Sequence, residues 1–169
     1  MFCVGDYIMY GKCGVCKLTD ICRSPFDAKD TKQYYELRPI SNVTSVIYTP
    51  VDNDKIMLRK LMDKDDAQKF LDRVASIAPL TVENEKKRRD IYKEAIADLY
   101  PDGYVSVIRT VYERRRAFEA ARRHITDADS EFESLAKRSL FGELSIVLGI
   151  PVEQVEQTIF GIISESETV

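Results

Sequence analysis

Four cysteines are the residues whose type and spacing could most directly carry chemistry. Cys13 and Cys16 form a CxxC pair, and Cys3 and Cys22 flank it. A four-thiolate zinc site is usually built from two closely spaced pairs, and only one pair is close here. A redox CxxC lies at a helix N-terminus, whereas this one lies between two strand-like runs. We therefore interpret the cysteines as small apolar residues of a turn and its strands. A thiol or zinc protein that uses all four stays as the alternative hypothesis.

Other catalytic patterns are missing from the sequence. His124 is the single histidine, and it follows Arg122 and Arg123 at the end of a helical pattern, where a cation is favoured by the helix dipole. One histidine without a nucleophile is not a catalytic triad. There is no glycine-rich phosphate loop and no HExxH zinc motif. We expect no catalytic residue, no metal and no cofactor, and thus a binding protein and not an enzyme.

The charge is unevenly distributed along the chain. The 169 residues carry a net charge of −3, but residues 80–125 hold eleven basic and eight acidic residues, and residues 126–169 hold two and nine. A local basic face is compatible with nucleic-acid contact, although the overall charge predicts weak binding. No apolar run is long enough to span a membrane, and the acidic start of the chain does not resemble a signal peptide. We expect a cytoplasmic protein.

The first third of the chain has the pattern of short strands. β-branched and aromatic residues cluster between turn signals, which is typical of strands joined by tight turns. The expected strands are Val4–Tyr10, Val15–Cys22, Gln33–Arg38, Val43–Thr49 and Ile56–Leu61. Five such strands predict a small β-barrel.

From Asp63 onward the apolar residues recur with helical spacing. The expected helices are Lys64–Ile77, Glu83–Leu99, Tyr104–His124, a fourth capped by Thr126 or Asp127 and ending before Gly149, and a fifth opened by Pro151 and running through Ile163. Pro101-Asp102-Gly103 is expected to interrupt the chain between the second and third helices.

The sequence therefore predicts an α+β protein of two domains. Residues 1–62 form the small five-stranded barrel, and residues 63–169 form an all-α bundle of about five helices. A monomer is the default expectation.

Two charged features of the helical half have structural interpretations. Arg109, Arg116 and Arg123 are spaced by seven, and the Arg109–Glu113 spacing allows an i,i+4 pair, so we expect a solvated, self-paired face. Glu143 falls on an apolar face and is expected to bond a basic side chain or a backbone amide at a helix junction.

An ordered set of motifs runs through both halves of the chain. It comprises Phe2, Val4-Gly5-Asp6-Tyr7-Ile8, Tyr10-Gly11, Gly14-Val15, Ile21, Tyr34-Tyr35, Leu37-Arg38, Thr49-Pro50-Val51-Asp52-Asn53 and Leu58-Arg59-Lys60-Leu61, followed in the helical half by Arg89, Tyr92-Lys93, Leu140, Gly142-Glu143-Leu144 and Gly149-Ile150-Pro151. This set resembles the CarD/CdnL family of bacterial RNA-polymerase-binding regulators. The first part is also similar to the polymerase-binding module of transcription-repair coupling factor.

The resemblance implies a fold and a function. The first domain would be a Tudor-like barrel that docks on the β subunit of bacterial RNA polymerase. The helical domain would contact promoter DNA at the upstream edge of the melted region, and the outcome would be altered stability of the open complex.

The resemblance also implies a polymerase-binding surface. It comprises Arg23, Val46, Ile47, Tyr48, Thr49 and Pro50. Strand 43–50 would offer its free edge to a partner strand. Tyr48 stands where the family often has an arginine, and it would anchor by packing and one hydrogen bond.

The implied DNA-binding residues lie near the start of the second helix. They are Lys86, Lys87, Arg88, Arg89 and Lys93. Basic residues at a helix N-terminus oppose the helix dipole, so a phosphate partner would explain them better than local stability. Arg88 stands where the family has a bulky apolar wedge, and it would enter a minor groove electrostatically.

Overall fold

The computed structural model describes residues 1–167. The chain divides into two compact units, Met1–Leu61 and Met62–Val169, and each is described by itself below. We call them the sheet unit and the helical unit.

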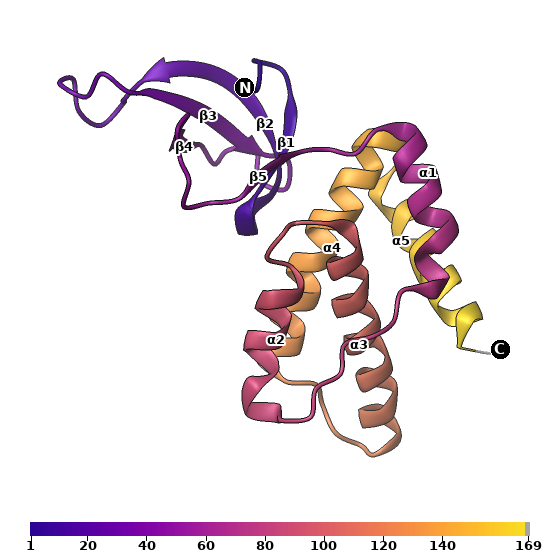
Figure 1. The fold of residues 1–169 in the computed structure, drawn as a ribbon. Coiled ribbons are helices and arrows are strands. Elements are labelled where there is room, and N and C mark those ends of the chain that lie inside the picture. The colour runs from indigo at the N-terminus through magenta and orange to yellow at the C-terminus, as the bar shows by residue number, and fades with distance from the viewer. Residues whose placement is uncertain (168–169) are drawn as a thin grey trace. The chain divides into compact units, whose positions relative to one another are not determined.

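The sheet unit is one antiparallel sheet of five strands (Figure 1). The strands are β1 (Tyr7–Tyr10), β2 (Gly14–Arg23), β3 (Gln33–Pro39), β4 (Ile47–Pro50) and β5 (Leu58–Lys60), with a short 3₁₀ turn, η1 (Gly11–Cys13), after β1. Their order is β4-β3-β2-β1-β5, so β4 and β5 are the two edge strands. The predicted number of strands is confirmed.

The fourth strand is shorter than predicted. The amide of Ser45 donates to the carbonyl of Asn42 at 3.0 Å, and this turn keeps residues 43–46 out of the ladder with β3. Only Ile47–Pro50 pairs, in the register Leu37↔Ile47 to Tyr34↔Pro50.

Alternation along the strands places one face of the sheet in a core. The fully packed residues are Ile8, Tyr10, Cys16, Leu18, Tyr35 and Leu37, with Phe2, Cys13, Ile21, Ile47, Val51 and Leu58 packed around them. The opposite side of β3 and β4 is left to polar and aromatic side chains, which form the candidate site described below.

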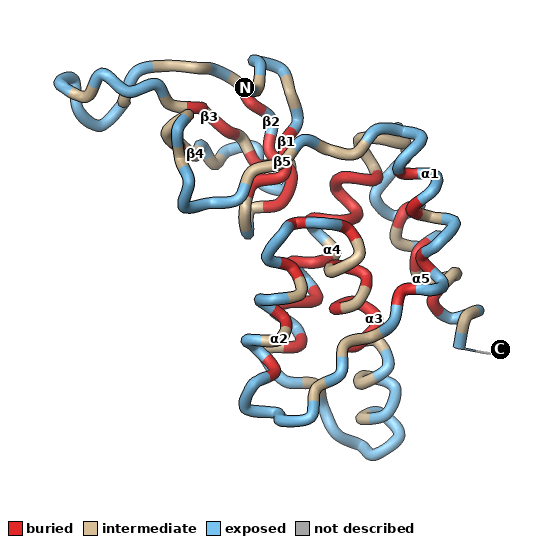
Figure 2. The backbone as a smooth tube through the Cα atoms, in the orientation of Figure 1, coloured by how far each residue is buried: buried red, intermediate tan, exposed pale blue. Residues whose placement is uncertain are grey.

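The helical unit contains five α-helices, as predicted (Figure 1). They are α1 (Lys64–Arg73), α2 (Arg88–Ala95), α3 (Pro101–Ala120), α4 (Asp127–Leu148) and α5 (Val152–Ser166), and two 3₁₀ turns, η2 (Val74–Ser76) and η3 (Glu85–Lys87), precede α2. Helix α4 packs against the other four helices. Residues 139–144 are all buried, so α4 is the centre of this unit (Figure 2).

The ends of α4 were predicted correctly. Thr126 and Asp129 form a capping box, in which each side chain accepts the other's backbone amide. Gly149 ends the helix with a φ of +68°, a left-handed conformation that glycine adopts without strain.

The predicted interruption at Pro101-Asp102-Gly103 is wrong, because these are the first three residues of α3. The chain turns before it, where Leu99 has a φ of +61°, and Pro101 opens α3 because proline lacks an amide hydrogen that the first helical turn would leave unbonded. Gly103 lies inside α3, where a Cβ would come within 1.8 Å of the carbonyl oxygen of Ala95. A glycine at this position therefore lets the end of α2 lie directly against α3.

Glu143 has the structural role predicted for it. It is fully buried in α4, and its carboxylate accepts the backbone amide of Met62 at 2.9 Å. It thus ties the segment that leads into α1 to the central helix.

Within the described residues, no single helix has the length and apolarity needed to cross a membrane. Helices α4 and α5 are long and apolar enough only when they are taken together, and the chain bends by 112° between them.

Candidate functional site

The free edge of β4 is the first candidate surface. The amide of Val51 donates to the carbonyl of Gln33 at 2.9 Å. Because successive residues of an antiparallel strand alternate their backbone groups between two sides, Thr49 and Ile47 also direct their backbone groups at β3. The N–H and C=O of Tyr48 therefore point to the open side of the sheet, where a partner strand could pair with them.

The side chain of Tyr48 is held in place on the sheet's polar face. Its hydroxyl donates to Glu36 Oε2 at 3.0 Å, and the other carboxylate oxygen, Oε1, accepts the hydroxyl of Thr19 at 2.8 Å. These two hydrogen bonds lower the pKa of Glu36. The ring of Phe26 packs edge-on to Tyr48 with centroids 5.7 Å apart, while Phe26 itself is 76% exposed. Tyr48 is therefore presented in one fixed orientation.

The other predicted polymerase-binding residues divide into two groups. Val46 and Arg23 are exposed and Pro50 is half-buried, so their side chains are accessible. Ile47 packs against the sheet core. Thr49 is only 1% exposed and accepts a hydrogen bond from Asn53 Nδ2 at 2.7 Å. These two residues stabilise the strand and do not offer side chains to a partner.

Two residues of this surface were missed by the sequence analysis. The sequence analysis placed Glu36 within the expected strand Gln33–Arg38 without a role, and it assigned nothing to Phe26. Their role depends on β3 pairing with β4 and on the loop folding back over Tyr48, and neither contact has a local sequence signal.

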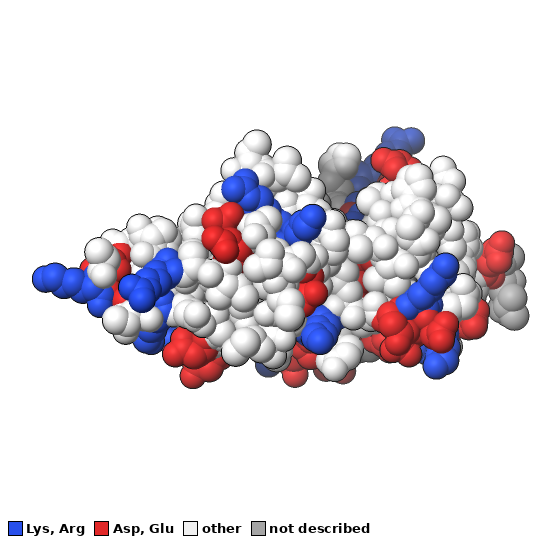
Figure 3. All heavy atoms as spheres, turned by 90° about the horizontal axis from the view of Figure 1, so that it is seen from above, with Lys and Arg blue, Asp and Glu red and all other residues white. Residues whose placement is uncertain are grey.

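The basic residues of η3 and α2 are the second candidate surface. Lys86, Lys87, Arg89 and Lys93 are all exposed. Arg89 pairs with Glu131 at 2.7 Å and lies over the ring of Phe132, and Lys93 lies 3.9 Å from Asp90. Two of these four cations are thus paired with acidic side chains, so charge alone favours only weak DNA binding. On the face of the molecule that Figure 3 shows from above, blue and red side chains are likewise interspersed.

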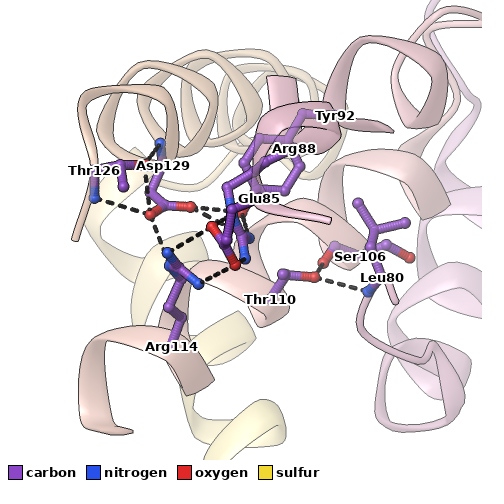
Figure 4. Close-up of polar contacts among 9 residues, drawn as sticks. All are labelled: Leu80, Glu85, Arg88, Tyr92, Ser106, Thr110, Arg114, Thr126 and Asp129. Carbon is purple, nitrogen blue, oxygen red and sulfur yellow. Dashed lines mark hydrogen bonds and ion pairs between the residues drawn. The ribbon is translucent and has the colours of Figure 1, made fainter. Parts of the chain in front are cut away.

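The prediction that Arg88 enters a minor groove is corrected by the structure. Its side chain lies inside the protein and is only 6% exposed. Its guanidinium donates from Nε and Nη2 to Glu85 and from Nη1 to the hydroxyl of Tyr92 (Figure 4). Nη1 also lies 3.5 Å from Asp129 Oδ1. As the protein stands, this arginine has no free face with which to enter a minor groove.

Arg114 of α3 completes this buried network. It donates from Nη1 and Nη2 to Glu85 and from Nε to Asp129 Oδ2 (Figure 4). The hydrogen bonds from Arg88 and then Arg114 lower the pKa of Glu85 to about 2. Burial raises the pKa of Asp129, but hydrogen bonds from Tyr92 and Thr126 outweigh it and leave the pKa below its usual value. Both carboxylates are therefore ionised at neutral pH.

The arginine-rich face of α3 is less solvated than predicted. Arg109 is only 7% exposed, and it donates to the carbonyl of Ala75 and to Ser166 Oγ. Arg115 pairs with Glu133 of α4, and Arg116 pairs with Glu167. These side chains join α3 to neighbouring segments, so the face mainly stabilises the helical unit.

The cysteines do not converge on a common site. Cys16 is buried in β2, and burial raises the pKa of its thiol to about 12, which leaves it protonated and a poor nucleophile or metal ligand. Cys3 is exposed before β1, and Cys22 lies at the far end of β2 opposite Tyr34. Among residues 1–167, no three histidine, cysteine or acidic side chains are grouped as a metal site would require.

Comparison with known protein families gives a match over the sheet unit. The sequence model of the CarD-like/TRCF RID domain matches residues 2–62, which covers all five strands. No curated protein was found to match the chain.

Proposed function

Residues 2–62 make this chain a CarD-like family member, and we propose that it is a bacterial transcription regulator that docks on the β subunit of RNA polymerase. The matched domain is an RNA-polymerase-interacting module, so the chain has a transcription-related role. In the proposal, the sheet unit supplies the docking surface and the helical unit contacts promoter DNA.

One observation carries the docking part of the proposal. β4 is an edge strand with an exposed backbone, and the hydrogen-bonded aromatic side chain of Tyr48 lies beside that edge. A partner strand could pair with the N–H and C=O of Tyr48, as in other complexes that form by strand addition. Phe26 and Tyr48 would then pack beside the added strand, since aromatic residues are common anchors of protein interfaces.

The DNA part of the proposal is supported by the exposed side chains of Lys86, Lys87, Arg89 and Lys93. Four cations on one turn and one helix can contact only a few phosphates, so binding to free DNA is expected to be weak. Docking on polymerase would raise the local concentration of DNA around α2 and make weak contacts effective. On this proposal the protein acts by binding, not by catalysis, and it alters the stability of the open complex.

The DNA part can be tested with a double variant, Lys86→Ala with Lys87→Ala. Removing two phosphate contacts should weaken binding of the full chain to a polymerase–promoter complex several-fold and reduce the salt slope by about two. The measurement is the lifetime of the open complex at several salt concentrations, with and without each protein.

The matched control is Lys64→Ala with Lys69→Ala, which removes the same charge from exposed positions of α1. The two double variants should differ clearly. If they change the open-complex lifetime equally, general charge and not the η3 surface explains the effect, and the DNA assignment fails.

A further inference from the structure

Glu85 occupies a site built from two arginines. Its Oε1 accepts hydrogen bonds from Arg88 Nη2 at 2.7 Å and Arg114 Nη1 at 3.0 Å. Its Oε2 accepts from Arg88 Nε and Arg114 Nη2, both at 2.9 Å. Each guanidinium thus holds the carboxylate through two parallel N–H donors, the arrangement by which arginine recognises carboxylate and phosphate groups.

The two guanidinium groups do not depend on Glu85 for their orientation. Arg114 Nε donates to Asp129 at 3.0 Å, and Arg88 Nη1 donates to Tyr92, whose own hydroxyl donates to Asp129 at 2.7 Å. Asp129 is fully buried and accepts the amide and hydroxyl of Thr126. If the Glu85 side chain moved away, this buried carboxylate would still hold both arginines, and four N–H groups would face the vacated position.

Glu85 is also the member of the network that can leave. Its side chain is 59% exposed, against 6% for Arg88, 15% for Arg114 and 0% for Asp129. It sits on η3, a single 3₁₀ turn in which the Asn84 side chain accepts the amide of Lys86 and the Asn84 carbonyl accepts the amide of Lys87. A hollow of about 320 Å³ is lined by both arginines, and also by Thr110 and the acidic Glu113.

We propose that this pair of arginines is a binding site for a backbone phosphate of DNA, and that Glu85 is an internal substitute that fills it in the free protein. The inference rests on the proposed function and deepens it, since it supplies a phosphate contact on the same surface. The exposed neighbours Lys86, Lys87 and Arg89 favour a DNA strand over a free phosphate ion, because they can hold the phosphates on either side.

Competition from Glu85 would also keep the free protein from binding DNA. A phosphate must displace a carboxylate that is already in contact with both guanidinium groups. Only DNA presented at high local concentration, as on a polymerase, would do so readily.

The first test compares Glu85→Gln with Glu83→Gln by fluorescence anisotropy on a short labelled duplex without polymerase. Both changes remove one negative charge, but Glu83 is an exposed residue outside the network. Glu85→Gln should bind the duplex roughly ten-fold more tightly than wild type, with a salt slope steeper by about one. Glu83→Gln should stay close to wild type. Adding Arg114→Met to Glu85→Gln should abolish the gain.

A second measurement needs no variant. In the wild-type chain, duplex DNA at the high concentrations of an NMR sample should displace Glu85 and shift the signal of the Arg88 Nε–H, whose partner changes from carboxylate to phosphate. It should leave the Arg114 Nε–H, which is bound to Asp129, nearly unchanged. The site assignment is overturned if Glu85→Gln gains no more than Glu83→Gln, if the gain survives Arg114→Met, or if the Arg88 Nε signal does not respond to DNA.

Inorganic phosphate provides the last comparison. If it saturates the Arg88 signal as effectively as an equal phosphate concentration of duplex, the site takes a free anion and the DNA assignment is wrong. Failure of the inference is distinguishable from failure of the proposed function. Loss of binding in the Lys86/Lys87 double variant would uphold the DNA surface even if the Glu85 comparison gave no difference.

Discussion

Replacing Asp129 with alanine is expected to lower the free energy of unfolding of the helical unit by about 3–5 kcal/mol, the usual cost of removing one partner from a buried ion pair. Asp129 is fully buried and receives hydrogen bonds from Tyr92, Arg114 and Thr126. Its loss would leave the largely buried guanidinium of Arg88 with fewer partners and would also remove the capping box of α4.

Urea denaturation followed by circular dichroism measures this change. The control is Glu131→Ala, on the same helix, where the acidic side chain is 53% exposed and pairs with Arg89 on the surface. It should cost less than about 1 kcal/mol, because surface ion pairs contribute little. Similar losses in the two variants would show that the buried network does not stabilise the unit.

Replacing Tyr48 with proline is expected to weaken binding of the full chain to RNA polymerase by more than about ten-fold, equivalent to roughly 1.4 kcal/mol or more. Proline removes the outward N–H of β4 and the aromatic side chain together. The ladder with β3 should survive, because the Tyr48 amide points away from it and proline is tolerated at such positions of edge strands.

Two further variants separate these effects. Tyr48→Ala removes the side chain but keeps the amide, so its loss of binding should be smaller. Lys60→Pro makes the equivalent change on β5. The amide of Gly11 donates to the carbonyl of Met57, so by alternation the backbone groups of Arg59 face β1 and the amide of Lys60 points outward. Biolayer interferometry with polymerase core enzyme measures all three. If Lys60→Pro weakens binding as much as Tyr48→Pro, β4 is not the docking edge.

Elements with local signals were predictable from the sequence. Thr126, Asp129 and Gly149 fix the ends of α4 through contacts within a few residues, and clusters of β-branched and aromatic residues between turn signals located the five strands. Pro101 was misread because proline is compatible both with a break and with the first turn of a helix, and the sequence alone does not distinguish them.

The candidate sites were less predictable, because their geometry depends on distant residues. Arg88 was expected to enter a minor groove, but in the structure it is buried against Arg114 and Asp129, which come from two other helices. Phe26 reaches Tyr48 only through the fold of the sheet unit. Sequence patterns thus indicated which surfaces to inspect, while tertiary contacts decided which side chains are accessible there.

Amide hydrogen exchange of the full chain, with and without RNA polymerase core enzyme, tests the central claim most directly. If β4 docks by strand addition, exchange of the Tyr48 amide should slow markedly in the complex, whereas exchange of the outward Lys60 amide of β5 should not change. A stable complex in which the Tyr48 amide exchanges as fast as in the free protein would contradict the account.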